Sequence, residues 1–302
     1  MRPKALQVLV ALDGEMPLAT LARDTGLSTD GASRAVRELE GLALASRRRS
    51  GIQVLVRPLP HPARDPMRLE FSRFPELDLA RAVRGRRADL LAGIGFARPA
   101  FLRRAVGLSK GAAGAAFKVF KGLGLLRLDD ETKYRVSDGH RPLQAFCQAI
   151  CDMETRRWMD QAGLKDGRVL WSRGSEALVA VPDGATPTGD LKAAAYTAAA
   201  ARGVAFLGRD RYYIRSKRRQ VWPDALLQCL LVPPRTRLSR THAIVMYAAK
   251  RRQPLAPLAR WYGVEEEAGR ILAFVDAGRD DPLVLPRGDV LEIAERYGVS
   301  VD

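Results

Sequence analysis

The strongest constraint on the fold is a residue pattern that occurs at 27–44 and returns 81 positions later at 108–125. The two segments align without a gap, and a glycine precedes each of them. Each offers a serine that can cap a helix, alanines at helical spacing, and a Gly-Leu pair where the helix would end. The identical positions are Leu27/Leu108, Ser28/Ser109, Ala32/Ala113, Ala35/Ala116, Gly41/Gly122, Leu42/Leu123 and Leu44/Leu125. The sequence therefore predicts one turn–helix–exit unit that is present twice.

Similar elements are predicted around both segments. Before each repeated helix the hydrophobic spacing indicates two helices, and after it two strand-like runs flank a turn. The elements predicted around the first copy are helices at 4–13 and 17–25 and strands at 43–49 and 52–56. Around the second copy they are helices at 88–95 and 98–106 and strands at 125–128 and 134–136. This order is typical of a winged helix-turn-helix, in which the third helix enters the major groove of DNA.

The first copy carries side chains that suit DNA. Its alanines and Leu39 mark an inward stripe, so polar residues are left on the outer face of the helix. Arginine reads guanine through two hydrogen bonds, and arginines at a hairpin tip suit phosphates or a minor groove. The candidate DNA-binding residues here are Thr29, Ser33, Arg34 and Arg37 on the helix, and Arg47, Arg48 and Arg49 at the hairpin tip. The alternative is a three-helix protein-interaction module whose charges are solvated.

The second copy is predicted to differ in role. Gly114 and Ala115 replace Ser33 and Arg34, and the hairpin tip at 129–133 is acidic. Lysine holds phosphate as a point charge and reads bases poorly. The candidate DNA-binding residues of this copy are Lys110, Lys118 and Lys121. We therefore expect the first copy to read sequence and the second to grip the DNA backbone or pack against another subunit.

Composition favours a polyanionic partner and a reducing compartment. The 302 residues carry a net charge of +16, which suits nucleic acid. No apolar segment has the length of a membrane span and no signal peptide is recognised, so the expectation is a cytoplasmic protein without a membrane partner. Three cysteines exclude a disulfide scaffold. Cys147 and Cys151 lie one helical turn apart with His140 nearby, but a metal site needs three or four converging ligands, so no metal and no cofactor are expected.

The segment between the two copies and the one after them are interpreted as connections. Residues 57–66 are proline-rich and indicate a semi-rigid connector, and the residues through Phe71 and Phe74 suggest an extra strand on the first hairpin. Residues 142–158 predict a long helix of the kind that mediates dimerisation after a hairpin. A homodimer is therefore expected.

The remaining residues predict a small α/β region and then a helical bundle. Strands are expected at 168–172, 177–181, 204–207 and 212–214, and helices at 187–201, 223–231, 241–250, 255–262 and 265–278. A positive rim is expected at Arg215, Lys217, Arg218 and Arg219. Residues 258–264 repeat the Leu-Ala-Arg frame of residues 21–27, but the next helix opens with Glu265-Glu266-Glu267, which would repel phosphate. This third unit is expected to pack within the protein or to contact a partner protein rather than to read DNA.

An enzymatic role is not expected. Residues 171–175 invite comparison with the Gly-Ser element of nucleotidyltransferases, but no Asp-x-Asp pair follows to hold two metal ions. No phosphate-binding loop, dinucleotide fingerprint or histidine–nucleophile pairing is apparent in the sequence.

The two modules resemble winged helix-turn-helix regulators of the MarR-like kind, on Gly26-Leu27-Ser28 with residues 38–42 and on Gly107-Leu108-Ser109 with Gly122-Leu123. The layout is also similar to type IV abortive-infection (AbiE) antitoxins, with 223–227 as the nearest local match; there a winged helix binds the operator and a C-terminal region carries a second activity. The second winged-helix copy departs from that family.

The prediction is an α+β protein with two tandem winged helix-turn-helix domains, at 1–66 and 67–160, and an α/β and helical C-terminal domain at 161–302. The predicted function is a dimeric, sequence-specific regulator that binds double-stranded DNA. The alternative is an antitoxin-like protein that regulates its own gene and neutralises a partner toxin through the C-terminal domain.

Overall fold

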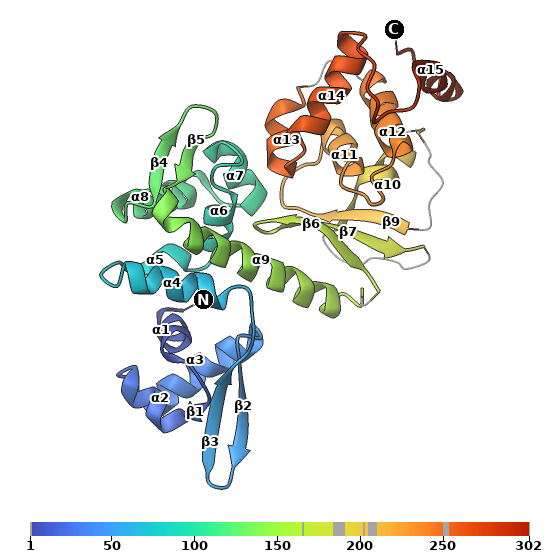
Figure 1. The fold of residues 1–302 in the computed structure, drawn as a ribbon. Helices are drawn as coiled ribbons and strands as arrows, with labels where there is room; N and C mark the ends of the chain where they lie inside the picture. The colour runs from blue at the N-terminus through green and yellow to red at the C-terminus, as the bar shows by residue number, and fades with distance from the viewer. Residues whose placement is uncertain are drawn as a thin grey trace. The chain divides into compact units, whose positions relative to one another are not determined.

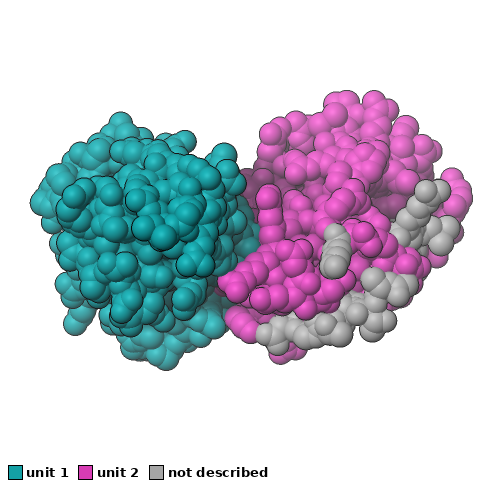
Figure 2. Space-filling model, turned by 90° about the horizontal axis from the view of Figure 1, so that it is seen from below, with its two compact units in different colours: residues 1–155 teal, residues 156–302 magenta. Residues whose placement is uncertain are grey.

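The computed structural model describes residues 2–164, 166–183, 191–201, 203–204, 210–249 and 254–301. The chain forms two compact units, 1–155 and 156–302 (Figure 2). The division falls inside the long helix α9 (Arg141–Gln161). Both units mix helices with small antiparallel sheets, in agreement with the predicted α+β class. Within the described ranges, no helix combines the length and apolar character that crossing a bilayer requires.

The first half of unit 1 is a three-helix cluster followed by a hairpin (Figure 1). The helices pack around buried leucines, among them Leu9, Leu21 and Leu39. The short strand β1 pairs with β3, which pairs with β2. The elements are α1 (Pro3–Ala11), β1 (Met16–Pro17), α2 (Leu18–Asp24), α3 (Thr29–Gly41), β2 (Ala45–Ser50) and β3 (Gln53–Pro58).

The second half of unit 1 repeats this order with a shorter hairpin. The helices α3 and α8 each contain 13 residues, begin directly after the repeated serine and end at the repeated glycine. The elements are α6 (Arg87–Gly93), α7 (Pro99–Val106), α8 (Lys110–Gly122), β4 (Leu126–Asp129) and β5 (Lys133–Val136). A single 3-10 turn, η1 (Asp138–His140), leads into α9.

The turn before each repeated helix is closed by the same hydrogen bond. Leu27 N–H donates to Ala22 O at 2.9 Å, and Leu108 N–H donates to Arg103 O at 2.9 Å. The glycine in each turn has a left-handed backbone, φ +63° at Gly26 and +72° at Gly107, which a residue with a Cβ rarely adopts. This explains why glycine precedes both segments.

The start and the exit of each repeated helix also match. The Ser28 hydroxyl accepts from Gly31 N–H at 3.1 Å and the Ser109 hydroxyl from Ala112 N–H at 3.2 Å, as expected of N-caps. At the exit, Leu44 N–H donates to Leu39 O at 2.9 Å and Leu125 N–H to Phe120 O at 3.0 Å. The internal repeat seen in the sequence is thus a repeat of backbone conformation as well.

The segment between the two halves corrects two expectations. The residues through Phe71 lie in helix α4 (Arg64–Arg73), not in an extra strand, and this helix also takes the end of the proline-rich connector. Pro66 lies in the first turn of α4, where the missing N–H would have no intrahelical acceptor. Met67 and Glu70 form the buried face of α4. The short helix α5 (Leu79–Val83) follows and leads to α6.

Unit 2 is built on a four-stranded antiparallel sheet in the order β6–β7–β9–β8. Strand β7 is buried along Ala177 to Val181 because both of its faces are covered. On one face, Val179 and Val181 pack against Met159 and Leu164, which lie at and after the end of α9. The strands are β6 (Arg168–Arg173), β7 (Glu176–Pro182), β8 (Leu191–Ala193) and β9 (Asp210–Arg215).

Helices of unit 2 lie beside the sheet and above it in Figure 1. The predicted helix at 187–201 begins outside the described residues, at 187–190. It is wrong at 191–193, which form β8 and pair with β9, whereas α10 (Ala195–Ala200) is helical as predicted. Residues 205–207 of the predicted strand at 204–207 lie outside the described residues. The other helices are α11 (Trp222–Cys229), α12 (Arg237–Ala248), α13 (Ala256–Tyr262), α14 (Glu265–Asp276) and α15 (Arg287–Arg296), the last of which the hydrophobic pattern did not reveal.

Candidate nucleic-acid interface

The outer face of α3 presents two exposed arginines, as the spacing predicted. Ala32, Ala35 and Leu39 are buried, and Arg34 and Arg37 lie on the opposite side of the helix. Arg34 Nε donates to the backbone oxygen of Asp30 at 3.3 Å, one turn earlier on the same helix. Neither arginine forms an ion pair with any described residue. Their guanidinium charges are therefore available to an external anion.

Arg47 is bonded to residues of α3 rather than free in solvent. Its Nη2 lies 2.6 Å from Oε2 of Glu40, its backbone N–H donates to Oε1 of the same carboxylate at 3.0 Å, and its Nη1 donates to the Ser33 hydroxyl at 3.5 Å. Both charged side chains are about a quarter exposed, at 27%. This contact fixes β2 against the flank of α3.

Arg48 is also paired within the chain. It donates from Nε and from Nη2 to the two oxygens of Glu15, at 2.7 Å each, which is the two-pronged geometry that arginine and carboxylate favour. These hydrogen bonds lower the pKa of Glu15 and raise the pKa of Arg48. Glu15 directly precedes β1, so the pair joins the two outer strands of the small sheet.

The hairpin tip consists of residues 50–53, and only one of the three predicted tip arginines borders it. In the β2–β3 register, Ser50 faces Gln53, Arg49 faces Val54, and Arg47 faces Val56 two pairs further back. Arg49 is exposed and has no ion pair among the described residues. Beside it Ile52 is 97% exposed, which is unusual for a large apolar side chain that contributes nothing to the core. Arg49 and Ile52 are thus exposed together at this end of the hairpin.

The second copy places its lysines as the repeat predicts. Lys118 occupies the position of Arg37, and Lys110 that of Thr29; both are exposed. Lys121 instead contacts its own hairpin, with Nζ 4.8 Å from the centre of the Tyr134 ring. A hydrogen bond from Lys121 lowers the pKa of the Tyr134 hydroxyl. One of the three lysines is thus engaged in holding β5 near α8.

The acidic turn of the second hairpin is organised by Asp129. One oxygen of its carboxylate accepts hydrogen bonds from Glu131 N–H at 3.1 Å and from Thr132 N–H at 2.8 Å. These bonds, with that from the Thr132 hydroxyl, lower the pKa of Asp129, so the carboxylate stays negatively charged. A charged acidic turn opposes DNA, unlike the tip of the first hairpin.

The sequence did not reveal a basic cavity beside α3. It has a volume of about 480 Å³, and four cationic side chains line it with one acidic one, Glu38. The cations are Arg2, Lys4, Arg34 and Arg84. Arg84 follows α5, 50 positions after Arg34 (34 to 84), so no local pattern could have placed the two arginines together.

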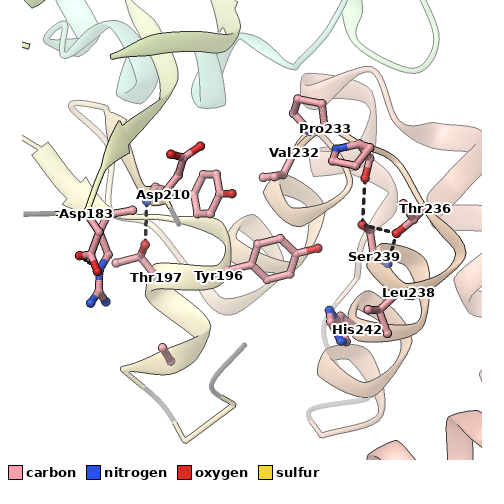
Figure 3. Close-up of a pocket in the computed structure, with 14 residues that line it drawn as sticks. Asp183, Tyr196, Thr197, Asp210, Val232, Pro233, Thr236, Leu238, Ser239 and His242 are labelled. Atoms are coloured by element: carbon pink, nitrogen blue, oxygen red, sulfur yellow. Dashed lines mark hydrogen bonds and ion pairs between the residues drawn. The ribbon is translucent and has the colours of Figure 1, made fainter. Parts of the chain in front are cut away.

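Unit 2 contains a cavity of different chemistry, of about 420 Å³ (Figure 3). Tyr196 from α10 points across it toward the start of α12, and its ring meets the His242 ring edge-on at 5.9 Å between centroids. Hydroxyl groups of Thr236 and Ser239 lie on the same wall. Asp183 and Asp210 line the opposite end, each paired with an arginine. The lining thus consists of rings, hydroxyls and two carboxylates whose charges are already balanced by arginines, one of which, Arg211, also lines the cavity.

The imidazole of His242 is neutral in this cavity at physiological pH. Burial lowers its pKa from 6.5 to about 4, because the charged form loses hydration inside the protein. Burial also raises the pKa of the neighbouring Tyr196 hydroxyl. Both rings are therefore uncharged at neutral pH.

The predicted positive rim of unit 2 is wrong at Arg218. Arg218 is 6% exposed and donates to both oxygens of Asp224, at 2.8 and 2.6 Å, while its Nε lies 3.0 Å from Glu176. The Tyr262 hydroxyl accepts from Arg218 at 3.0 Å and donates to Asp224 at 2.9 Å. Two acids and a hydroxyl compensate the buried charge, so Arg218 belongs to the core of this unit.

The cysteines are placed as packing residues. Cys147 and Cys151 are buried, and burial raises the pKa of both thiols. His140 does not join them: its Nδ1 lies 2.5 Å from Oε1 of Glu70, a fully buried residue of α4. No group of three metal-ligating side chains converges within the residues that the structure describes.

Comparison with known proteins gave no family model that matches the chain, and no significant match among curated proteins or solved structures. The resemblance to winged-helix regulators and AbiE antitoxins therefore stays a prediction that rests on the repeated segments.

Proposed function

We propose that the chain is a sequence-specific, double-stranded DNA-binding transcriptional regulator, and that the two repeated halves of unit 1 are winged helix-turn-helix domains. The observation that carries the proposal is the pair Arg34 and Arg37: both are exposed on the outer face of α3 without an ion pair to any described residue. An exposed helix face of this width fits the major groove, and arginine is the side chain that reads guanine there.

The hairpin of the first copy supports the same proposal. Arg49 borders the tip and Ile52 forms part of it, so a charged and an apolar side chain project together. Minor-groove proteins combine these two kinds of side chain, because arginine responds to the negative potential of a narrow groove and apolar groups wedge between bases. In this proposal Arg47 and Arg48 hold the hairpin in place through their ion pairs with Glu40 and Glu15, and these ion pairs keep them from DNA.

The second copy is proposed as an anchor rather than a reader. Lys118 stands where the first copy has Arg37, and Gly114 and Ala115 leave the outer face of α8 without base-reading groups. A cation placed this way contacts phosphates and contributes affinity for any sequence. The acidic turn at Asp129 keeps the second hairpin away from the DNA backbone.

A homodimer in the cytoplasm, with a protein-binding role for unit 2, completes the proposal. No described feature of unit 2 favours the antitoxin-like alternative over the regulator, so the neutralisation of a partner toxin stays a prediction. The third helical unit has its own left-handed glycine, Gly263 at φ +70°, but Arg270 on α14 is paired with Glu266 and Asp281. Arg270 is therefore engaged within unit 2 and is not available to DNA.

Selection of bound sequences from a random pool of duplex DNA tests the proposal. The expected result is one enriched motif, arranged as two inverted half-sites if the protein binds as a dimer. Equal recovery of all sequences, with an affinity that depends only on salt, would show a non-specific architectural protein instead. Failure to retain any duplex at low salt would exclude DNA binding altogether.

A further inference from the structure

The basic cavity beside α3 combines residues of the first half of unit 1 with Arg84 from the segment between the two halves. Arg2 and Lys4 come from the start of α1, and Gly31, Arg34 and Glu38 come from α3. Arg84 directly follows α5, in the segment that leads into the second repeat. Cations from three separate elements therefore converge on one hollow of about 480 Å³.

Most of the charge around this cavity is uncompensated. Glu38 accepts from the backbone N–H of Arg2 at 2.8 Å and lies 3.8 Å from the Arg2 guanidinium. Lys4 and Arg84 are exposed and form no ion pair with any described residue. Bringing like charges together costs free energy unless an anion joins them. The positive charge around the cavity therefore suits the binding of a phosphate.

The position of the cavity indicates which phosphate it would take. Arg34 belongs both to its lining and to the outer face of α3 that is proposed to enter the major groove. The phosphates that border a major groove lie directly beside a helix inserted in it. The second copy has Ala115 and Val119 at the positions of Arg34 and Glu38, so it does not repeat this charge pattern.

We propose that this cavity binds one backbone phosphate of the DNA that α3 reads, and that Arg84 is its principal added contact. The inference rests on the proposed function and extends it. It gives the segment between the two repeats a role in docking, because Arg84 contacts the backbone at the edge of the groove and so helps to set the register of the first half of unit 1 on DNA. Its contribution is independent of base sequence.

Binding of Arg84→Ala to the selected site and to a scrambled duplex, at several salt concentrations, tests the proposal. We expect affinity for both duplexes to fall by roughly tenfold at low salt, as for a lost charge-assisted hydrogen bond. The slope of log affinity against log salt should fall by about 1. The matched control is Arg81→Ala, which removes the same charge from an exposed position of α5 outside the cavity. Equal thermal unfolding of both variants and wild type confirms that they are folded.

The outcomes separate this inference from the function on which it rests. If Arg84→Ala and Arg81→Ala behave alike while wild type still prefers its selected site, the phosphate site is wrong and the regulator stands. If wild type binds no duplex, both proposals fail. Calorimetric titration of the DNA-free protein with inorganic phosphate and pyrophosphate tests whether the cavity binds a free anion rather than a DNA phosphate. Tight binding that Arg84→Ala abolishes, without any loss of DNA affinity, would mean a free anion occupies the cavity and would overturn the assignment to DNA.

Discussion

Nη2 of Arg47 lies 2.6 Å from Oε2 of Glu40, and this ion pair joins β2 to the flank of α3. The equivalent positions of the second copy hold Leu128 and Lys121, so the same junction there is made differently, by Lys121 on the ring of Tyr134. Leu128 is left 78% exposed. The two hairpins are therefore attached to their helices by different chemistry, although the helices themselves match in length and caps.

Glu40→Gln should strengthen DNA binding without regard to sequence. The substitution removes a negative charge beside the proposed reading face and releases Arg47 for a phosphate. The slope of log affinity against log salt should therefore become steeper by up to about 1. The cost in stability should stay below about 1 kcal/mol, because the pair is partly exposed. Glu76→Gln, an exposed site in the same unit, is the matched charge control. Identical affinities for the two variants would mean that Glu40 does not lie near DNA.

Gly114→Ala should stabilise unit 1 and weaken DNA binding. A Cβ at this position meets nothing within 4 Å, so alanine adds helix propensity of about 1 kcal/mol at no steric cost in the free protein. If α8 approaches DNA closely, the added methyl group lowers affinity. Gly26→Ala, at φ +63°, should instead destabilise the fold and serves as the opposite control in urea unfolding. Stabilisation with unchanged affinity would contradict a close approach of this face.

Unit 2 should lose stability between pH 6.5 and about pH 4 through His242. The folded state keeps this imidazole neutral down to about pH 4, whereas the unfolded chain binds a proton near pH 6.5. Unfolding therefore takes up a proton, and stability falls as the pH is lowered through this window. The ring is partly exposed, so we expect about 1 to 2 kcal/mol rather than the full value of the shift.

The measurement compares wild type with His242→Gln at pH 7 and pH 4.5. All four tryptophans of the chain, Trp158, Trp171, Trp222 and Trp261, lie in unit 2, so tryptophan fluorescence follows the unfolding of that unit alone. His242→Gln should lose stability less steeply on acidification than wild type. Parallel losses in the two proteins would show that His242 does not carry this dependence.

Arg218→Met should destabilise unit 2 by about 3 to 5 kcal/mol. The substitution leaves the carboxylates of Glu176 and Asp224 buried without their shared cation. Arg219→Met, one position further at an exposed site, should stay within about 0.5 kcal/mol of wild type by the same fluorescence measurement. Equal stability of the two variants would place Arg218 at the surface, where the sequence alone had suggested it.

These cases show what the sequence could predict. The turn, the cap and the exit of the first repeated helix depend on hydrogen bonds of Gly26, Ser28 and Leu44 to residues no more than five positions away. A local pattern in the sequence is therefore enough to predict the roles of these residues. The register of both repeated helices followed from the same local rules.

Long-range pairing explains what the sequence could not show. Arg48 is bound to Glu15 and Arg218 to Glu176, across separations of 33 and 42 positions. Consecutive arginines therefore looked equivalent at 47–49 and at 218–219, although only Arg49 and Arg219 are exposed without an ion pair among the described residues. The basic cavity depends on Arg84 in the same way, because it is assembled from three elements.

The central claim is that Arg34 and Arg37 read bases, and the most direct test is the ratio of affinities for a selected duplex and a scrambled one at matched salt. Replacing both arginines by alanine should cost about 1 to 3 kcal/mol per residue on the selected duplex and bring the ratio close to one. Lys118→Ala, at the position of Arg37 in the second copy, should weaken both duplexes equally and preserve the ratio. A double variant that keeps the wild-type ratio would contradict the assignment of α3 as the reading helix.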